Sequence, residues 1–177
     1  MAFDRRPDPN EYNAYYDRYI ALVPAGDIIA LLSVQLDDTL ALLRDLTEDQ
    51  ALHAYAAGKW TIKEVIGHIM DAERVFSYRA LRFARGDATP LASFDENRYV
   101  PAGAFNTRPV TTLISELTAV RRATVAFYAG LSGDAWLRGG TASGNYMSVR
   151  GLAWTTAGHE LHHRLLLTDR YLSGLRA

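Results

Sequence analysis

The sequence predicts an all-α fold: a four-helix bundle with a long crossover between its second and third helices. Four segments place apolar residues three and four positions apart, and no stretch of comparable length alternates as a strand does. Segments of about 20 residues form helices about 30 Å long, the usual length in such bundles. We treat the 177 residues as a single domain over 1–177, with 1–25 as an extension that packs on the bundle.

The first long helix is expected from about Gly26 to Leu46, with Asp27 placed to cap its start. Its apolar face is formed by Ile29, Leu32, Leu36, Leu40 and Leu43. Ahead of it, Glu11–Val23 is expected to form a short helix that Pro24 closes. The tyrosines of this segment suit packing over one end of a bundle; they are Tyr12, Tyr15, Tyr16 and Tyr19.

The second helix begins at Thr61, because Thr61-Ile-Lys-Glu64 fits a capping box, and it extends to about Arg85. The connection from Gly86 to Arg108 is longer than 20 residues. Connections of that length in compact domains are functional or cross from one end of a domain to the other. We therefore expect the crossover here.

The third helix has Pro109 in its first turn and ends near Gly130. The fourth opens after the Gly- and Ser-rich stretch Gly139–Asn145, with Ser148 as its cap, and continues to Leu172.

Composition excludes several classes of protein. With no cysteine, the chain has no disulfide, thiolate nucleophile, zinc finger or iron–sulfur cluster. Its 19 Lys and Arg residues against 20 Asp and Glu residues leave a net charge of −1, so we expect no nucleic-acid or membrane partner. No apolar run is long enough to span a membrane and no signal peptide is visible, so we expect a cytoplasmic protein.

Three of the five histidines lie in the run His159-Glu-Leu-His162-His163 of the fourth helix. Residues four apart share a helix face, so His159 and His163 can turn both imidazoles toward one point. His162 lies about 100° around the helix from His163. His68 of the second helix would complete a three-histidine site if the two helices are neighbours. Three nitrogens with an open position form a catalytic geometry. Metal affinity should fall below about pH 6, where the imidazoles protonate in competition with the ion.

Other interpretations of these residues remain open. Histidines on helices are often ordinary core or surface residues, and pairs four apart also occur in helices that bind no metal. Glu64 and Asp71 could orient His68 or remain solvated. The His159–His163 run also matches the HExxH motif of zinc proteases. Only fourteen residues follow it and no strand is evident, so a hydrolase of that kind is a poor second choice.

Two further features of the second helix have open roles. Arg79 shares the helix face of His68, and with Arg82 and Arg85 it could hold an acidic substrate group or pair with nearby carboxylates. Trp60 precedes the cap and fits a hydrophobic staple. Glu160 lies about 100° around the helix from His159, so we expect it outside the site and name no general base.

The run from Trp60 to Arg74, with its Trp-x₃-Glu-x₃-His element, and the late run Gly158–His163 together resemble the DinB superfamily, the DinB/YfiT-like metalloenzymes. The resemblance covers about Ile20 to Leu172. It implies an up-up-down-down bundle, often a homodimer, that binds nickel or zinc at His68, His159 and His163. Relatives include transferases and isomerases that use low-molecular-weight thiols.

The resemblance implies a metal-dependent enzyme that activates a water or a low-molecular-weight thiol for transfer to a small electrophilic substrate. A non-catalytic metal-binding stress-response protein is the alternative, and a bundle whose histidines are structural and whose purpose is dimerisation is a third. The sequence itself gives only a weak reason to expect a dimer. Ile62, Ile66 and Ile69 lie away from the His68 face and could need a partner, although the bundle core could equally absorb them.

Overall fold

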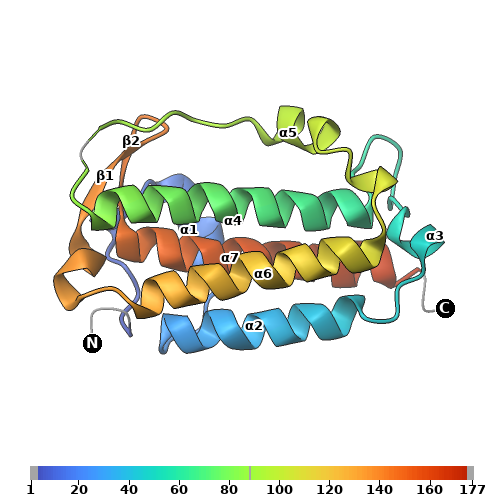
Figure 1. Ribbon diagram of the computed structural model, residues 1–177, viewed down its shortest axis with the longest axis horizontal. Coiled ribbons are helices and arrows are strands. Elements are labelled where there is room, and N and C mark those ends of the chain that lie inside the picture. The colour runs from blue at the N-terminus through green and yellow to red at the C-terminus, as the bar shows by residue number, and fades with distance from the viewer. Residues whose placement is uncertain (1–3, 88, 175–177) are drawn as a thin grey trace.

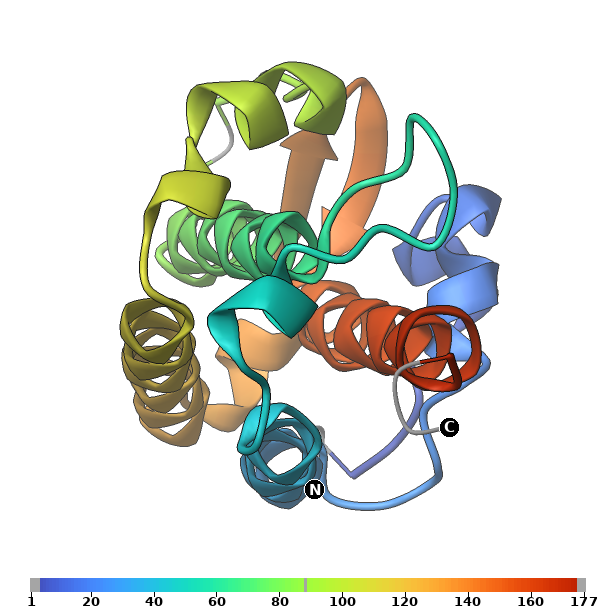
Figure 2. The same cartoon turned by 90° about the vertical axis from the view of Figure 1, so that its right-hand side faces the viewer.

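Four long helices lie side by side in the computed structural model, which describes residues 4–87 and 89–174 (Figure 1 and, end on, Figure 2). They are α2 (Ile28–Leu43), α4 (Ile62–Ala84), α6 (Val110–Ala129) and α7 (Val149–Leu166). The shorter α-helices are α1 (Asp17–Ile20), α3 (Glu48–Ala51) and α5 (Glu96–Ala102). Four 3-10 turns lie at Pro9–Glu11, Ala14–Tyr16, Phe105–Thr107 and Gly133–Leu137. A π-helical turn at Leu167–Leu172 follows α7. None of the described helices is long and apolar enough to cross a membrane. The predicted four-helix bundle is confirmed.

The predicted helix starts are present. The Asp27 carboxylate accepts a hydrogen bond of 2.8 Å from the Ile29 amide. At α4 the Glu64 amide donates to the Thr61 hydroxyl (3.1 Å) while the Thr61 amide donates to the Glu64 carboxylate (2.8 Å), which completes the capping box. The Ser148 hydroxyl accepts from the Gly151 amide at 2.8 Å.

The helices run up, down, down and up in chain order, so the up-up-down-down order implied by the family resemblance is wrong (Figure 1). That order would need long crossings after the first helix and after the third. Here the long connection 85–109 joins α4 to α6 and makes these two helices parallel. The Lys63 Nζ at the start of α4 accordingly donates to the Arg108 carbonyl just before α6, at 2.8 Å.

A β-hairpin occupies the Gly- and Ser-rich stretch before α7, where no strand is evident from the sequence. Strand β1 (Gly139–Ala142) pairs antiparallel with β2 (Asn145–Ser148) through a two-residue turn. Both turn residues, Ser143 and Gly144, have positive φ, as a type I′ turn requires. The Leu91 amide donates to the Thr141 carbonyl at 2.9 Å, which ties the crossover to this hairpin. The Ser143-Gly144 pair is the local signal for this turn in the sequence.

The N-terminal segment is broken into short turns and is not the single helix expected over Glu11–Val23. Its backbone is extended at Tyr12 and Asn13, and the Asn13 side chain caps the next turn by accepting from the Tyr15 amide at 2.9 Å. The segment nevertheless packs on the bundle along α7. A Cβ added to Gly158 would lie 2.1 Å from the Tyr19 carbonyl oxygen, so this glycine permits the close approach of α1.

The core fills the space between the four helices. Ile62, Ile66 and Ile69 are 0%, 0% and 2% exposed, because this face of α4 turns into the bundle. Of the two alternatives for these isoleucines, burial in the bundle core is the one that the structure shows, so they give no reason to expect a dimer.

One buried polar network touches all four long helices. Arg121 of α6 makes two hydrogen bonds to the Glu73 carboxylate of α4, of 2.9 and 2.8 Å. Its Nη1 lies 2.6 Å from the Glu160 carboxylate of α7, which also accepts from the Thr39 hydroxyl of α2 at 2.7 Å. Glu160 therefore serves the bundle interior, away from the histidine cluster, and the HExxH match has no catalytic geometry here.

Candidate metal centre

The three predicted histidines meet between α4 and α7, which are neighbours. The Nε2 atom of His159 lies 3.0 Å from that of His68 and 3.2 Å from that of His163. One ligand atom from each ring lies within 4.8 Å of the others, and the three residues are 7%, 5% and 8% exposed. Helix spacing thus places His159 and His163 on one face, and the packing of α4 on α7 supplies His68.

The donor set fits a cation better than it fits hydrogen bonds among the rings. A neutral imidazole has a single lone pair, on its unprotonated nitrogen. His159 Nε2 is close to both of its partners, so at most one of the two contacts can be a well-formed hydrogen bond. Nitrogens bound to one zinc ion at 2.0–2.1 Å in tetrahedral geometry lie about 3.4 Å apart. The spacing of the rings therefore suits a shared divalent ion.

Burial keeps these rings neutral. It lowers the pKa of His68 to about 4 and that of His163 to about 3, with the other imidazoles lowering the His163 value further. The pKa of His159 also falls well below the ordinary histidine value, first because of burial and then because His163 and His68 are close. Neutral rings at pH 7 have the free lone pairs that metal binding requires.

Aromatic side chains fix the orientation of the cluster. The Trp60 ring lies 4.9 Å from that of His68, and the Phe76 ring lies 5.7 Å from that of His159. Tyr19 packs 5.3 Å from His159, a contact that the absence of a side chain at Gly158 makes possible. Trp60 is therefore a wall of the site as well as the residue before the α4 cap.

The remaining candidates lie outside the cluster. Glu64 belongs to the capping box, and Asp71 lies 3.7 Å from Arg74. His162 is half-buried and its ring packs 5.4 Å from Tyr19. The buried Nδ1 of His163 has no hydrogen-bond partner among the described residues, so a water or ligand atom would have to satisfy it.

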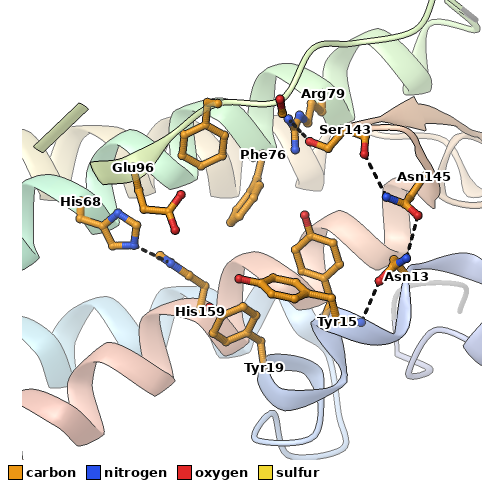
Figure 3. A pocket seen from close by; sticks show the side chains of 13 residues that line it. Asn13, Tyr15, Tyr19, His68, Phe76, Arg79, Glu96, Ser143, Asn145 and His159 are labelled. Atoms are coloured by element: carbon orange, nitrogen blue, oxygen red, sulfur yellow. Dashed lines mark hydrogen bonds between the residues drawn. The ribbon is translucent and has the colours of Figure 1, made fainter. Parts of the chain in front are cut away.

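A cavity of about 290 Å³ opens onto the cluster at His68 and His159 (Figure 3). Four parts of the chain form it: the N-terminal turns, α4 with α7, the crossover, and the hairpin turn. Its lining includes Asn13, Tyr15, Tyr16, Tyr19, Phe76, Arg79, Ser93, Phe94, Glu96, Ser143 and Asn145. A second cavity of about 280 Å³ reaches His163 and is lined by residues including Tyr55, Lys59, Trp60, Asn97 and Tyr171. The histidine cluster is thus accessible from two sides.

Sequence reasoning missed most of this lining. The tyrosine cluster was assigned to packing over one end of the bundle, whereas Tyr15, Tyr16 and Tyr19 border the cavity. Phe94 and Glu96 come from the crossover, whose length was the signal for a functional connection. Arg79 of the second helix does face the cavity, as its shared face with His68 allowed.

Comparisons with known proteins agree with this architecture. The sequence model of the DinB superfamily matches residues 31–167. One similar solved structure is that of YfiT from Bacillus subtilis, described as a probable metal-dependent hydrolase with an unusual four-helix bundle topology. Its sequence is 16% identical to this chain. The two structures align with a TM-score of 0.73 over 98% of this chain and 94% of YfiT. The crystal structure of a mycothiol-dependent maleylpyruvate isomerase is also similar, at 17% sequence identity to this chain. It aligns with a TM-score of 0.67 over 89% of this chain and 68% of the isomerase chain. No curated protein sequence matches significantly. At these identities the two structural likenesses show the fold.

Proposed function

Because the chain belongs to the DinB superfamily, we propose that it is a metal-dependent enzyme in which His68, His159 and His163 bind a divalent ion beside a substrate cavity. The observation that carries the proposal is the convergence of three neutral, buried imidazoles at the wall of a cavity. A divalent ion held there would supply a nucleophile at neutral pH, since it would lower the pKa of a water or thiol. Zinc and nickel, the ions implied by the family resemblance, are among the first-row metals that imidazole ligands suit.

The chain's own residues would exclude water and handle protons. Trp60, Phe76 and Tyr19 pack on the ligand rings and keep them in one orientation. Glu96 is the one carboxylate among the described residues that line the cavity, and Figure 3 shows it beside His68. We propose that Glu96 accepts or donates a proton during the reaction.

Water and a small thiol are both retained as nucleophiles. The chain has no cysteine, so thiol chemistry would require a low-molecular-weight thiol bound from solution. One structural neighbour is a probable metal-dependent hydrolase and the other a mycothiol-dependent isomerase, and this pair supports both possibilities. A small electrophilic molecule is the proposed substrate class in either case. The two cavities that reach the cluster favour an enzyme over a closed, non-catalytic metal site.

Elemental analysis followed by paired activity assays tests this proposal. The purified protein should contain about one zinc or nickel ion per chain. Hydrolysis of an activated ester and conjugation of a small thiol to 1-chloro-2,4-dinitrobenzene should then be measured before and after chelation. Metal-dependent turnover in one assay supports the proposal and identifies the nucleophile. Stoichiometric metal without turnover in either assay, even with a broad panel of thiols and electrophiles, would favour the non-catalytic alternative.

A homodimer is also proposed, on the family resemblance alone, because the isoleucines that first motivated it are buried. Sedimentation equilibrium at micromolar concentration should give twice the chain mass. A monomer would remove this part of the proposal.

A further inference from the structure

Arg79 is a buried cation with no carboxylate partner among residues 4–87 and 89–174. Arg79 is only 2% exposed to solvent. Its Nη2 donates to the Ala92 carbonyl at 2.8 Å and to the Ser143 hydroxyl at 3.0 Å, and both acceptors are neutral. A guanidinium carries five N–H donors, so these two bonds leave donors for other groups in the cavity.

The other buried cations of the described chain are paired. Arg121 lies 2.8 Å from Glu73, Lys63 lies 2.6 Å from Glu48, and Arg150 forms an ion pair with Glu11. Burial opposes the positive charge of Arg121, but its two glutamates outweigh this effect and raise its pKa. Burial lowers the pKa of Arg79, the neighbouring Tyr16 opposes this only in part, and no carboxylate of the described residues pairs with it. A buried charge without a counter-ion is costly, so Arg79 strongly favours an incoming anion.

Arg79 and His68 line opposite ends of the same cavity. Eleven residues separate them on α4, which is close to three full turns and about 16 Å along the helix axis, so their side chains share a face. Figure 3 shows Phe76 between them and Arg79 beside Ser143 of the hairpin turn. The guanidinium lies 5.8 Å from the centre of the Phe94 ring. A molecule that reaches from Arg79 to the histidines therefore passes along aromatic walls.

We infer that Arg79 binds the carboxylate of a small organic acid whose apolar body lies along Phe76 and whose reacting atom faces the histidine cluster. The planar guanidinium fork matches a carboxylate in two parallel hydrogen bonds. A carboxylate also suits the charge of the cavity better than a phosphate dianion does. Among the described residues that line the cavity, Arg79 is the one cation, and Glu96 already adds a negative charge. The direction of the reacting atom rests on the proposed function, whereas the carboxylate site rests on Arg79 alone.

A purely structural role is the competing interpretation. Arg79 joins the crossover, through Ala92, to the hairpin turn, through Ser143. An Arg79→Gln variant separates the two roles, since its amide still donates hydrogen bonds to neutral acceptors but carries no charge. An Arg79→Lys variant keeps the charge and loses the fork. Arg85→Gln removes an exposed arginine from the end of the same helix and serves as the matched control.

Binding of benzoate and of its neutral analogue benzamide, measured by titration calorimetry or NMR, tests the inference. The protein is used as purified and again after chelation, because a metal ion could itself bind a carboxylate. We expect the wild-type protein to bind benzoate at least ten-fold more tightly than benzamide in both states. Arg79→Gln should abolish this preference, Arg79→Lys should retain part of it, and Arg85→Gln should leave it unchanged. Unfolding midpoints measured without ligand verify that each variant is folded.

Three results would overturn the inference. They are equal affinity for benzoate and benzamide, benzoate binding that survives Arg79→Gln, and the absence of benzoate binding to the wild-type protein at millimolar concentration. The metalloenzyme proposal fails separately, through elemental analysis. A protein with no stoichiometric metal that still shows Arg79-dependent benzoate binding would remove the metal centre and keep the carboxylate site.

Discussion

Arg121 and Glu160 form an ion pair of 2.6 Å in the interior of the bundle, one residue along α7 from the metal-ligand candidate His159. Both side chains are almost completely buried, and Glu73 shares the same guanidinium. The pair fixes the rotation of α7 relative to α6, because turning either helix would leave a charge unpaired. The orientation of His159 toward His68 thus depends on an interaction that lies outside the site.

Replacing Arg121 by Met should therefore destabilise the protein strongly. The change leaves the buried Glu73 and Glu160 without their cation, and breaking a buried ion pair in this way costs about 3–5 kcal/mol. Urea denaturation measures the loss of unfolding free energy. Arg74→Met is the control, since Arg74 pairs with Glu116 at the surface and such pairs contribute about 0–1 kcal/mol. Equal effects of the two changes would contradict the role assigned to the buried network.

Removing any one of the three histidines should abolish stoichiometric metal binding. His68, His159 and His163 each supply one of three protein nitrogens, and the chain has no cysteine to replace one. His162→Ala is the matched control, because its ring packs beside Tyr19 outside the cluster. Elemental analysis of the four variants, with circular dichroism to verify folding, provides the measurement. Full metal content in a His159→Ala/His163→Ala double variant would remove the proposed site.

Acid should destabilise the metal-free protein well before it protonates the folded cluster. The unfolded chain takes up protons on these histidines below about pH 6.5, whereas burial holds the folded pKa values of His68 and His163 near 4 and 3. Between these limits the unfolded state binds more protons, so stability falls as pH decreases from about 6.5 to about 4. Metal should likewise be retained to lower pH than the value near 6 expected for ordinary imidazoles.

Denaturation of the chelated protein across this pH range checks the prediction. A His163→Gln variant, which cannot titrate at that position, should show a smaller loss of stability on acidification. An identical pH profile for the variant and the wild-type protein would show that His163 is not responsible.

Local signals in the sequence were sufficient for the four long helices and for the shared face of His159 and His163, whereas His68 joined that pair only through the family resemblance. Asp27, Thr61 and Ser148 cap their helices through hydrogen bonds to residues two or three positions away, so their roles can be recognised in a short stretch of chain. The helix order and the cavity depend on contacts between distant residues. Asn13 and Asn145 make a hydrogen bond of 2.7 Å beside the cavity although 132 positions separate them, and no local pattern encodes that meeting.

Gly158→Ala should disturb the site without touching a ligand. The added Cβ would lie 2.1 Å from the backbone oxygen of Tyr19, a group that cannot move without displacing α1 from α7. Overpacking of this kind costs about 1–3 kcal/mol. Because Tyr19 packs on His159 and lines the cavity, the displacement should also weaken benzoate binding and loosen the cluster, while the three ligand nitrogens remain present. Gly133→Ala is the control, since a Cβ there meets no atom within 4 Å and its φ is not positive. Thermal unfolding and benzoate titration of the two variants measure the effect. If Gly158→Ala and Gly133→Ala give the same unfolding midpoint and the same benzoate affinity, the close approach of α1 does not shape the cavity.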